Sequence, residues 1–324
     1  VRSGPVGHHR SRRKPGLGLD WGQVMTSAQT GGIIKPMTAA EVDKLVQRIL
    51  RDQVSTLPHI AARIMQVAND ESAGADTLRK VVEADPTLSA RIIKCVNSAA
   101  YALRNRVNNL HRAICLIGFQ QVRNLAVSAS VAEIFRDDNA IGPYKRSELW
   151  RHLVSVAIAA RLIAMRVNVQ CFEEAFLAGL LHDFGLILED QFCHKQFEAM
   201  ITGPLEGQPL VQTEQELLGF DHTILGARAA ESWCFPEDVV AAIRFHHAPE
   251  NYRGKHVDVV ACVELANIVC TLKGVTSVGL KLLPATRLAI ERYSLSREDI
   301  VVIMNDLDEE LERYQELLNL AKGK

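Results

Sequence analysis

Apolar residues recur at helical spacing through most of the chain from Thr38 onward. No segment shows β-branched residues that alternate with polar ones between turn signals, as a half-buried strand would. Proline or acidic residues in a first turn mark helix starts at three places: Pro58, Asp85-Pro86, and Pro236 with Glu237 and Asp238. The pattern therefore predicts an all-α protein.

The first 36 residues do not follow this pattern. Residues 1–36 are rich in Gly, Ser and basic side chains and contain few apolar ones, so burial cannot offset the entropy lost on ordering. We expect a disordered basic tail, and the alternative is a tail that binds nucleic acid or a membrane surface. Because position 1 is Val, Met25 and Met37 are candidate translation starts.

Breaks in the helical pattern divide the rest of the chain. A first helical group spans residues 37–145 and closes with a polar, Gly- and Pro-containing linker at 136–143. A second group, residues 146–275, contains the clustered histidines and is interrupted by a Gly- and Pro-rich loop at 202–212. Residues 276–324 are expected to form a C-terminal helical extension.

The C-terminal extension carries an apolar stripe behind a possible N-cap at Ser296. The stripe has alternating spacings of four and three residues and comprises Ile300, Met304, Leu307, Leu311, Tyr314 and Leu318. Such spacing fits either a helix packed on its own domain or a coiled-coil seam in a homodimer. Three heptads are near the minimum for a coiled coil, so we favour packing on the domain and keep the homodimer as the alternative.

Composition narrows the class of protein. With 324 residues, 48% of them hydrophobic, the chain can bury a large core, and 37 basic against 38 acidic residues give no overall preference for nucleic acid. The seven cysteines include no C-x-x-C pair, which indicates a reducing compartment. No apolar run approaches the roughly 20 residues that span a bilayer, and no signal-peptide core is present at the start. We expect a cytoplasmic protein without a membrane partner.

A candidate metal site emerges from the histidines. His182-Asp183 follows the apolar run 175–181 and precedes a turn expected at Gly185, where the helix should end. Three other segments contribute His152, His222 and the pair His246-His247. Neutral imidazole together with carboxylate suits divalent transition metals such as Fe, Mn or Zn, whereas Mg and Ca prefer oxygen. The pattern therefore predicts one or two such ions at this cluster.

Two of these positions also have interpretations that need no metal. His152 lies among apolar residues and could be a core histidine with an ordinary hydrogen-bond partner. His182 and Asp183 would point about 100° apart on a continuous helix, so both can face one ion only if the helix ends there. The alternative is that Asp183 merely orients His182.

The remaining positions are equally open. Asp221 could cap a helix whose first residue, His222, is exposed. His246-His247 closes a helix, where the macrodipole favours a cationic imidazole without any metal.

The histidine spacing resembles the HD superfamily of metal-dependent phosphohydrolases. The surrounding residues resemble its HDOD branch, the HD-related output domains of bacterial signalling proteins. The resemblance rests on Leu57-Pro58, Asp85-Pro-Thr-Leu-Ser-Ala-Arg91, Val96-Asn-Ser-Ala99, Ala113-Ile-Cys-Leu-Ile-Gly118, Leu149-Trp150, Gly179-Leu-Leu-His-Asp-Phe-Gly185, Gly219-Phe-Asp-His222 with Gly226, Trp233, Pro236 and His246-His247.

This resemblance implies an HD-like helical domain packed against an N-terminal helical subdomain. It also implies a regulatory or scaffolding role through partner proteins, with His152, His182, Asp183, His222, His246 and His247 as the metal ligands. One position departs from the family pattern, because Asn267 stands where the HD pattern ends in a helical Asp. An amide oxygen brings no charge, so metal affinity should fall, and Asp258 lies too far upstream to take its place.

Two functions follow from these observations. The first is a signal-transduction module that binds signalling proteins and keeps a structural, vestigial or ligand-sensing metal site. The second is a phosphohydrolase acting on a nucleotide or related phosphoester, whose metal-bound water attacks phosphorus and whose Arg244 or Lys255 contacts phosphate. The Gly-Tyr-Pro signature of HD proteins that cleave cyclic di-GMP is missing.

Nucleic-acid binding is a weaker third option. It would use the basic tail or the pair Arg104 and Arg106. Because no aromatic residues are interleaved with the tail, stacking platforms for bases are missing, and we do not expect a nucleic-acid partner.

Overall fold

Helices joined by short turns build the part of the chain that the structure describes. A computed structural model describes residues 37–51, 59–69, 74–137, 140–203, 208–279 and 287–322. Within these ranges no strand forms, and the one β-type contact is an isolated bridge between Ile141 and Tyr144. The predicted all-α class is confirmed. None of the described helices is both long enough and apolar enough to cross a bilayer.

The N-terminal helices pack around α6 (Phe119–Val131). Every residue of α6 from Val122 to Val131 is buried, so this helix has no face left for solvent. It contacts α2, α4 and α5, and it also contacts α8 of the following group. The elements of this group are α2 (His59–Asn69), α3 (Ala75–Glu83), α4 (Pro86–Val96), η1 (Ala99–Tyr101), α5 (Leu110–Ile117), α6 and η2 (Ala132–Phe135).

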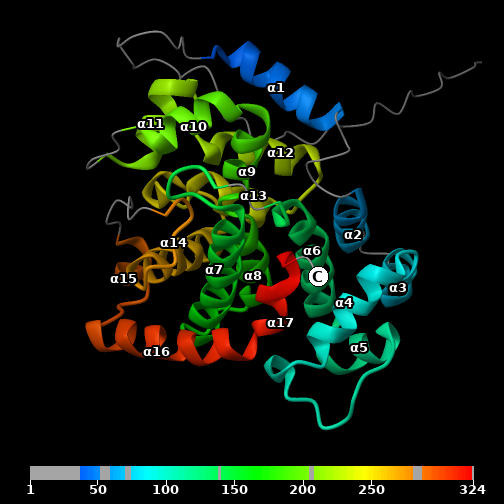
Figure 1. Cartoon of the computed structure of the whole chain (residues 1–324). Coiled ribbons are helices and arrows are strands. Elements are labelled where there is room, and N and C mark those ends of the chain that lie inside the picture. The colour runs from blue at the N-terminus through cyan, green and yellow to red at the C-terminus, as the bar shows by residue number, and fades with distance from the viewer. Residues whose placement is uncertain are drawn as a thin grey trace, which may run out of the picture.

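The second group of helices is organised around α7 (Arg146–Arg166), which packs most extensively against α8 and α14 (Figure 1). Helix α12 contacts both α9 and α13, and α13 contacts α8 and α14. The other elements are α8 (Phe172–Leu181), α9 (Phe184–Phe192), α10 (His194–Thr202), α11 (Leu210–Leu218), α12 (His222–Ser232), α13 (Glu237–Phe245), η3 (Pro249–Asn251) and α14 (Val257–Leu272).

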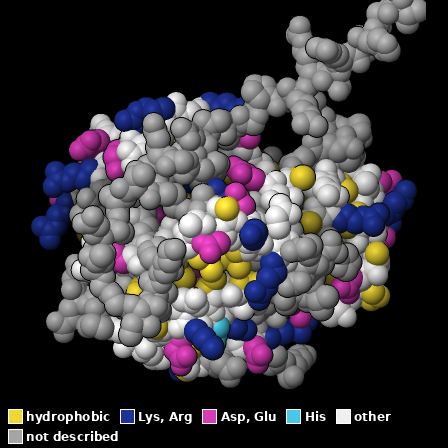
Figure 2. Space-filling model, turned by 90° about the horizontal axis from the view of Figure 1, so that it is seen from above, with side chains coloured by type: hydrophobic (Ala, Val, Ile, Leu, Met, Phe, Trp, Pro, Cys, Tyr) yellow, Lys and Arg dark blue, Asp and Glu magenta, His cyan; other side chains and the backbone are white. Residues whose placement is uncertain are grey.

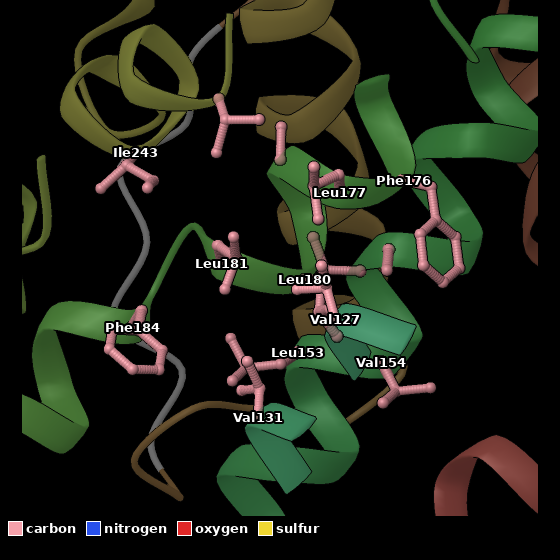
Figure 3. Close-up of a cluster of buried hydrophobic side chains, with 14 of the residues drawn as sticks. Val127, Val131, Leu153, Val154, Phe176, Leu177, Leu180, Leu181, Phe184 and Ile243 are labelled. Carbon is pink, nitrogen blue, oxygen red and sulfur yellow. The ribbon is translucent and has the colours of Figure 1, made fainter. Parts of the chain in front are cut away.

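Buried aliphatic and aromatic side chains join the two groups. Figure 3 shows Val127 and Val131 of α6 beside Leu153 of α7 and Leu180 of α8. All four side chains are fully buried. The same core extends to the start of α9 and to α13, so it fixes the helix ends that bring the candidate residues together.

Helix α1 (Ala39–Arg51) packs on α12, away from the other N-terminal helices (Figure 1). The Met37 backbone N–H donates to Leu218 O at 2.7 Å, and Arg228 forms an ion pair with Asp43. The guanidinium of Arg48 lies over the Phe192 ring, 5.6 Å from its centroid. The first described helix therefore contacts the part of the chain that carries the histidines.

The marked helix starts are found where the structure describes them. Asp85 caps α4 by accepting from the backbone N–H groups of Thr87 and Leu88, and Pro236 immediately precedes α13. Pro58 and the basic tail at 1–36 lie outside the described residues. The predicted linker falls between η2 and α7. The loop predicted at 202–212 is shorter than expected, because α10 includes Thr202 and α11 begins at Leu210. Residues 138–139 and 204–207 are likewise not described.

The C-terminal stripe packs on its own chain. Ser296 and Asp299 form a capping box at the start of α16 (Arg297–Arg313), and Leu307 and Tyr314 are buried in the core. The Trp150 indole donates to Leu318 O at 3.1 Å. This agrees with the favoured packing interpretation, and the homodimer stays a prediction. The neighbouring elements are α15 (Leu288–Arg292), α17 (Gln315–Leu318) and η4 (Asn319–Ala321).

The prediction that a helix ends at Gly185 was wrong by four residues. Helix α8 ends at Leu181, His182 and Asp183 form the turn, and Gly185 is the second residue of α9. A Cβ atom at Gly185 would lie 2.8 Å from His222 Cα and would overlap the His222 carbonyl. Gly185 is needed because the start of α9 touches the start of α12 there.

We expect Gly185→Ala to lower the free energy of unfolding by about 2–3 kcal/mol, since the methyl group meets backbone that cannot move aside. Urea denaturation followed by circular dichroism measures this change. Gly74→Ala is the matched control, because no heavy atom lies within 4 Å of its added Cβ. Equal losses in the two variants would contradict the close approach.

Candidate metal centre

The structure brings all six predicted site residues together, His152 from inside a helix and the other five at or next to helix ends. His152 comes from α7, His182 and Asp183 from the turn after α8, His222 from the first position of α12, and His246 and His247 from the end of α13. Their ligand atoms form two groups whose members lie within 4.8 Å of one another: Asp183, His222, His246 and His247, and His152, His182 and Asp183.

Asp183 belongs to both groups and divides its oxygens between them. Its Oδ1 lies 3.1 Å from Nε2 of His222 and 3.1 Å from Nε2 of His246. Its Oδ2 lies 3.3 Å from Nε2 of His182 and 3.5 Å from Nε2 of His152. The carboxylate thus lies between two candidate ion positions, and at each of them it can act as a ligand together with imidazoles.

The other ring nitrogens are held by acceptors outside the cluster. Nδ1 of His152 is 2.9 Å from Val275 O, and Nδ1 of His182 is 2.7 Å from Gly179 O. A carbonyl accepts only from a protonated nitrogen, so this pairing assigns the proton to Nδ1 and leaves the Nε2 lone pair facing inward.

In the second group, two of the three imidazoles also have partners outside the cluster. Nδ1 of His246 is 3.0 Å from Ile243 O, and Nδ1 of His222 is 2.8 Å from Glu214 Oε2. These outer partners fix the orientation of the His222 and His246 rings before any ion binds.

Local sequence explains how adjacent residues reach one point. Because α8 ends at Leu181, His182 and Asp183 are not held about 100° apart as neighbours on a continuous helix are. Asp221 caps α12 through the N–H groups of Thr223 and Ile224, as predicted. The accompanying interpretation that His222 is exposed was wrong, because its side chain is fully buried. Asp221 can therefore cap α12 while His222, the next residue, takes part in the cluster.

Burial and charge set the protonation of the cluster. Burial alone would raise the pKa of Asp183, but the surrounding histidines, His182 first among them, outweigh burial and lower it well below its ordinary value. Burial lowers the pKa of His182 to about 4. Burial, with His246 and His222 nearby, also lowers the pKa of His247 well below its ordinary value. An ionised carboxylate facing neutral imidazoles is the form that binds a cation.

His222 behaves differently because two acids flank it. Burial lowers its pKa, but Glu214 and Asp183 together outweigh burial and raise the pKa well above its ordinary value. Glu189 of α9 lies against Glu214, and burial followed by repulsion from Glu214 raises the pKa of Glu189 well above its ordinary value. Burial and the nearby Glu214 thus favour the protonated form of Glu189.

Sequence reasoning missed the outer partners. Glu214 lies on α11, eight residues before His222, and nothing in its local pattern distinguishes it from a solvent-facing acid. Glu189 sits in the apolar helix α9, where its position in a mostly buried segment was the available signal. The carbonyl of Val275 carries no signal in the sequence at all.

Other residues considered for the site lie in different surroundings. Asn267 is buried in α14, which packs against α7, α8 and α13. The Asp258 carboxylate binds Arg292 and Tyr293 at 2.7 and 2.6 Å, so it is engaged elsewhere. Arg244 donates to the Thr223 hydroxyl at 2.9 Å, and Lys255 pairs with Glu237 at the surface.

Known proteins resemble this chain in sequence and in fold. The family model of the HDOD domain matches residues 54–249. The crystal structure of an HDOD domain protein of unknown function from Geobacter sulfurreducens is 26% identical, with a TM-score of 0.69 over 87% of this chain and 98% of that chain. A protein from Marinobacter aquaeolei VT8, assigned provisionally to signal transduction, is 25% identical, with a TM-score of 0.66 over 89% of this chain and 67% of that chain.

A longer relative is also found. An uncharacterised protein of Treponema pallidum (strain Nichols) is 21% identical over 228 residues, which is 68% of this chain. The chain spans 43% of that relative's length.

The lowered pKa of His182 predicts a loss of stability in acid for protein kept in a chelator. The unfolded chain takes up a proton near the ordinary value of 6.5, and the folded chain does so only near 4. Stability from this residue is therefore present above pH 6.5 and is lost as the pH falls toward 4. Between pH 7 and pH 5 it contributes a loss of about 2 kcal/mol.

Urea denaturation at several pH values, with EDTA present, measures this loss. His182→Gln should show a decline that is shallower by that amount than the decline of the native chain. His111→Gln, which changes an exposed histidine, is the control. Parallel curves for the native chain and His182→Gln would show that His182 is not held neutral.

Proposed function

Because the chain belongs to the HDOD family, we propose that it is a cytoplasmic regulatory module of bacterial signal transduction that acts by binding partner proteins. In this proposal the chain carries a metal centre of the HD type that stabilises the fold or senses a ligand. The centre does not turn over substrate. Support comes from the HDOD match over residues 54–249 and from the burial of the centre.

The donor set fits Fe, Mn or Zn. Imidazole nitrogens outnumber carboxylate oxygens, which disfavours Mg and Ca. Asp183, His222, His246 and His247 offer four donors, enough to complete a tetrahedral ion. His152, His182 and Asp183 offer three, so a second ion would depend on a further ligand. The bound metal would supply positive charge and Lewis acidity at this point.

Burial of the centre is the observation that carries the regulatory proposal. His182 and His222 are fully buried, His152, Asp183 and His246 are at most 2% exposed, and His247 alone of the six is partly exposed. A catalytic metal keeps a coordination position open to water and substrate, whereas a structural one is enclosed by protein. Five of the six side chains are enclosed in this sense, and the four protein donors of the group that contains His247 leave no position open for substrate.

The three-donor group favours one alternative, a metal-dependent phosphohydrolase acting on a nucleotide or related phosphoester. Three protein ligands leave a position for water, whose pKa a metal lowers toward neutrality. In this alternative Asp183 joins the two ions, and Arg244, which is held beside His222 through Thr223, contacts phosphate.

We expect the native chain, purified without an affinity tag, to contain close to one equivalent of Fe, Mn or Zn by inductively coupled plasma mass spectrometry. Asp183→Ala should lose the metal, because its carboxylate serves both groups. His247→Ala should lose the ion of the four-donor group, whereas His182→Ala should keep it. Asn267→Asp should raise the content toward two equivalents by restoring a charged ligand.

His111→Ala is the control for this series, since it removes an imidazole far from the cluster in sequence and exposed to solvent. Metal that persists at full content in Asp183→Ala would place the ion elsewhere. Native chain without metal would leave the histidines as a structural cluster.

We expect metal-loaded protein to hydrolyse bis(4-nitrophenyl) phosphate and cyclic nucleotides no faster than Asp183→Ala does. Four protein donors leave substrate no open position on the metal. The rates should therefore stay far below ~1 s⁻¹, the lower end of the range typical of enzymes. Release of 4-nitrophenol and liquid chromatography of nucleotide products measure these rates. Turnover at about 1 s⁻¹ that disappears with EDTA and in Asp183→Ala would replace the regulatory proposal by the phosphohydrolase.

A further inference from the structure

A cavity of about 340 Å³ lies between α12, α13 and the segment that follows η3. Its volume falls in the range of about 300–1,000 Å³ that is usual for small-molecule sites. None of the six residues of the metal centre lines it. The lining residues are Ala227, Glu231, Val240, Ala241, Arg244, Phe245, Asn251, Tyr252, Arg253 and Gly254.

The walls of this cavity are apolar and partly aromatic. Ala227, Val240 and Ala241 are buried beneath it, and the Phe245 and Tyr252 rings stand 5.2 Å apart at 50°. Figure 2 shows, on the face seen from above, a hollow in which hydrophobic side chains gather and which Lys, Arg, Asp and Glu side chains border. Such walls suit a flat ring, which buries area without leaving polar groups unpaired.

The Tyr252 ring is held in place by its own loop. The backbone N–H of His256 donates to the Tyr252 hydroxyl at 3.3 Å. The ring lies so close to Gly254 that a Cβ there would come within 2.5 Å of its Cζ atom. The aromatic wall is therefore formed before a ligand arrives, which lowers the entropy cost of binding.

Charges at the rim favour an anion. The lining residues include two guanidinium groups, Arg244 and Arg253, and one carboxylate, Glu231. Arg244 is oriented by its bond to the Thr223 hydroxyl and lies over the Phe245 ring, with Cζ 5.5 Å from the centroid. Arg253 donates to the Glu250 and Tyr252 carbonyls and remains exposed. Guanidinium groups bind phosphate and stack on aromatic rings, so they suit both halves of such a ligand.

We propose that this cavity binds a nucleotide: a flat nitrogen heterocycle that carries a phosphate. The heterocycle packs against Phe245 and Tyr252, its N–H groups donate to Glu231 or Asn251, and the phosphate pairs with both Arg244 and Arg253. An aliphatic anion would leave the aromatic wall unused, and an uncharged ring would leave the two cations without a partner from the ligand.

Helix α13 connects this cavity to the metal centre. It lines the cavity with Val240, Ala241, Arg244 and Phe245, and the next two residues are His246 and His247. A ligand that shifts Arg244 also acts on Thr223, which follows His222. The use of this link in signalling rests on the proposed function, but binding in the cavity does not.

Isothermal titration calorimetry on the full chain, with EDTA present, tests the site with AMP and GMP as probes. We expect at least one of them to bind with a Kd below about 1 mM, and adenosine or guanosine and inorganic phosphate to bind at least tenfold more weakly. Because EDTA removes the metal, binding that persists does not come from a metal-bound phosphate. Binding that requires metal would overturn the cavity proposal and point instead to the phosphohydrolase.

Substitutions locate the site. Ala241→Trp, which fills the cavity, should weaken binding at least tenfold, and Arg253→Gln should weaken it several-fold. Arg112→Gln, an exposed arginine on α5, is the matched control and should bind as the native chain does. Where Ala241→Trp lowers the melting temperature, Arg253→Gln decides, because its side chain is exposed. Absence of nucleotide binding, equal binding of phosphate alone, or native affinity in Arg253→Gln would overturn the proposal.

Discussion

The buried carboxylate of Asp183 is the charge on which the candidate centre depends. An ionised group that is 2% exposed costs several kcal/mol unless neighbours compensate it, and here imidazoles of four histidines face its two oxygens. Those imidazoles come from inside α7, from the turn after α8, from the start of α12 and from the end of α13, so these helices must pack in fixed positions. The same positions of the helices therefore determine both the packing of this half of the molecule and the chemistry of the centre.

Close backbone contact makes that constraint possible. The starts of α9 and α12 meet at Gly185, where no side chain fits, and this contact sets Asp183 beside His222. The carbonyls of Gly179 and Val275 and the carboxylate of Glu214 then turn the rings inward. A metal bound here would stabilise the whole arrangement, because its free energy of binding adds to that of folding.

Much of this could be read from local patterns. Asp85 and Pro236 marked the starts of α4 and α13 because capping and proline geometry act within one turn. The six site residues were predicted because imidazoles and a carboxylate from several segments suit one transition-metal site, and because their motifs resemble those of a known family. The turn at His182-Asp183 was placed at Gly185 instead, because glycine signals both a helix end and a close approach. His222 was left open as an exposed residue because a cap says nothing about what packs on it.

The sequence by itself determined the helical class, the candidate ligands and the family, since periodicity, residue chemistry and motif spacing are local properties. Tertiary structure decided the rest: the two ligand groups that share Asp183, the hold of Glu214 on His222, the docking of α1 on α12, and the cavity beside α13. These features join residues that are distant along the chain. Their positions follow from how whole helices pack, which no single stretch of sequence records.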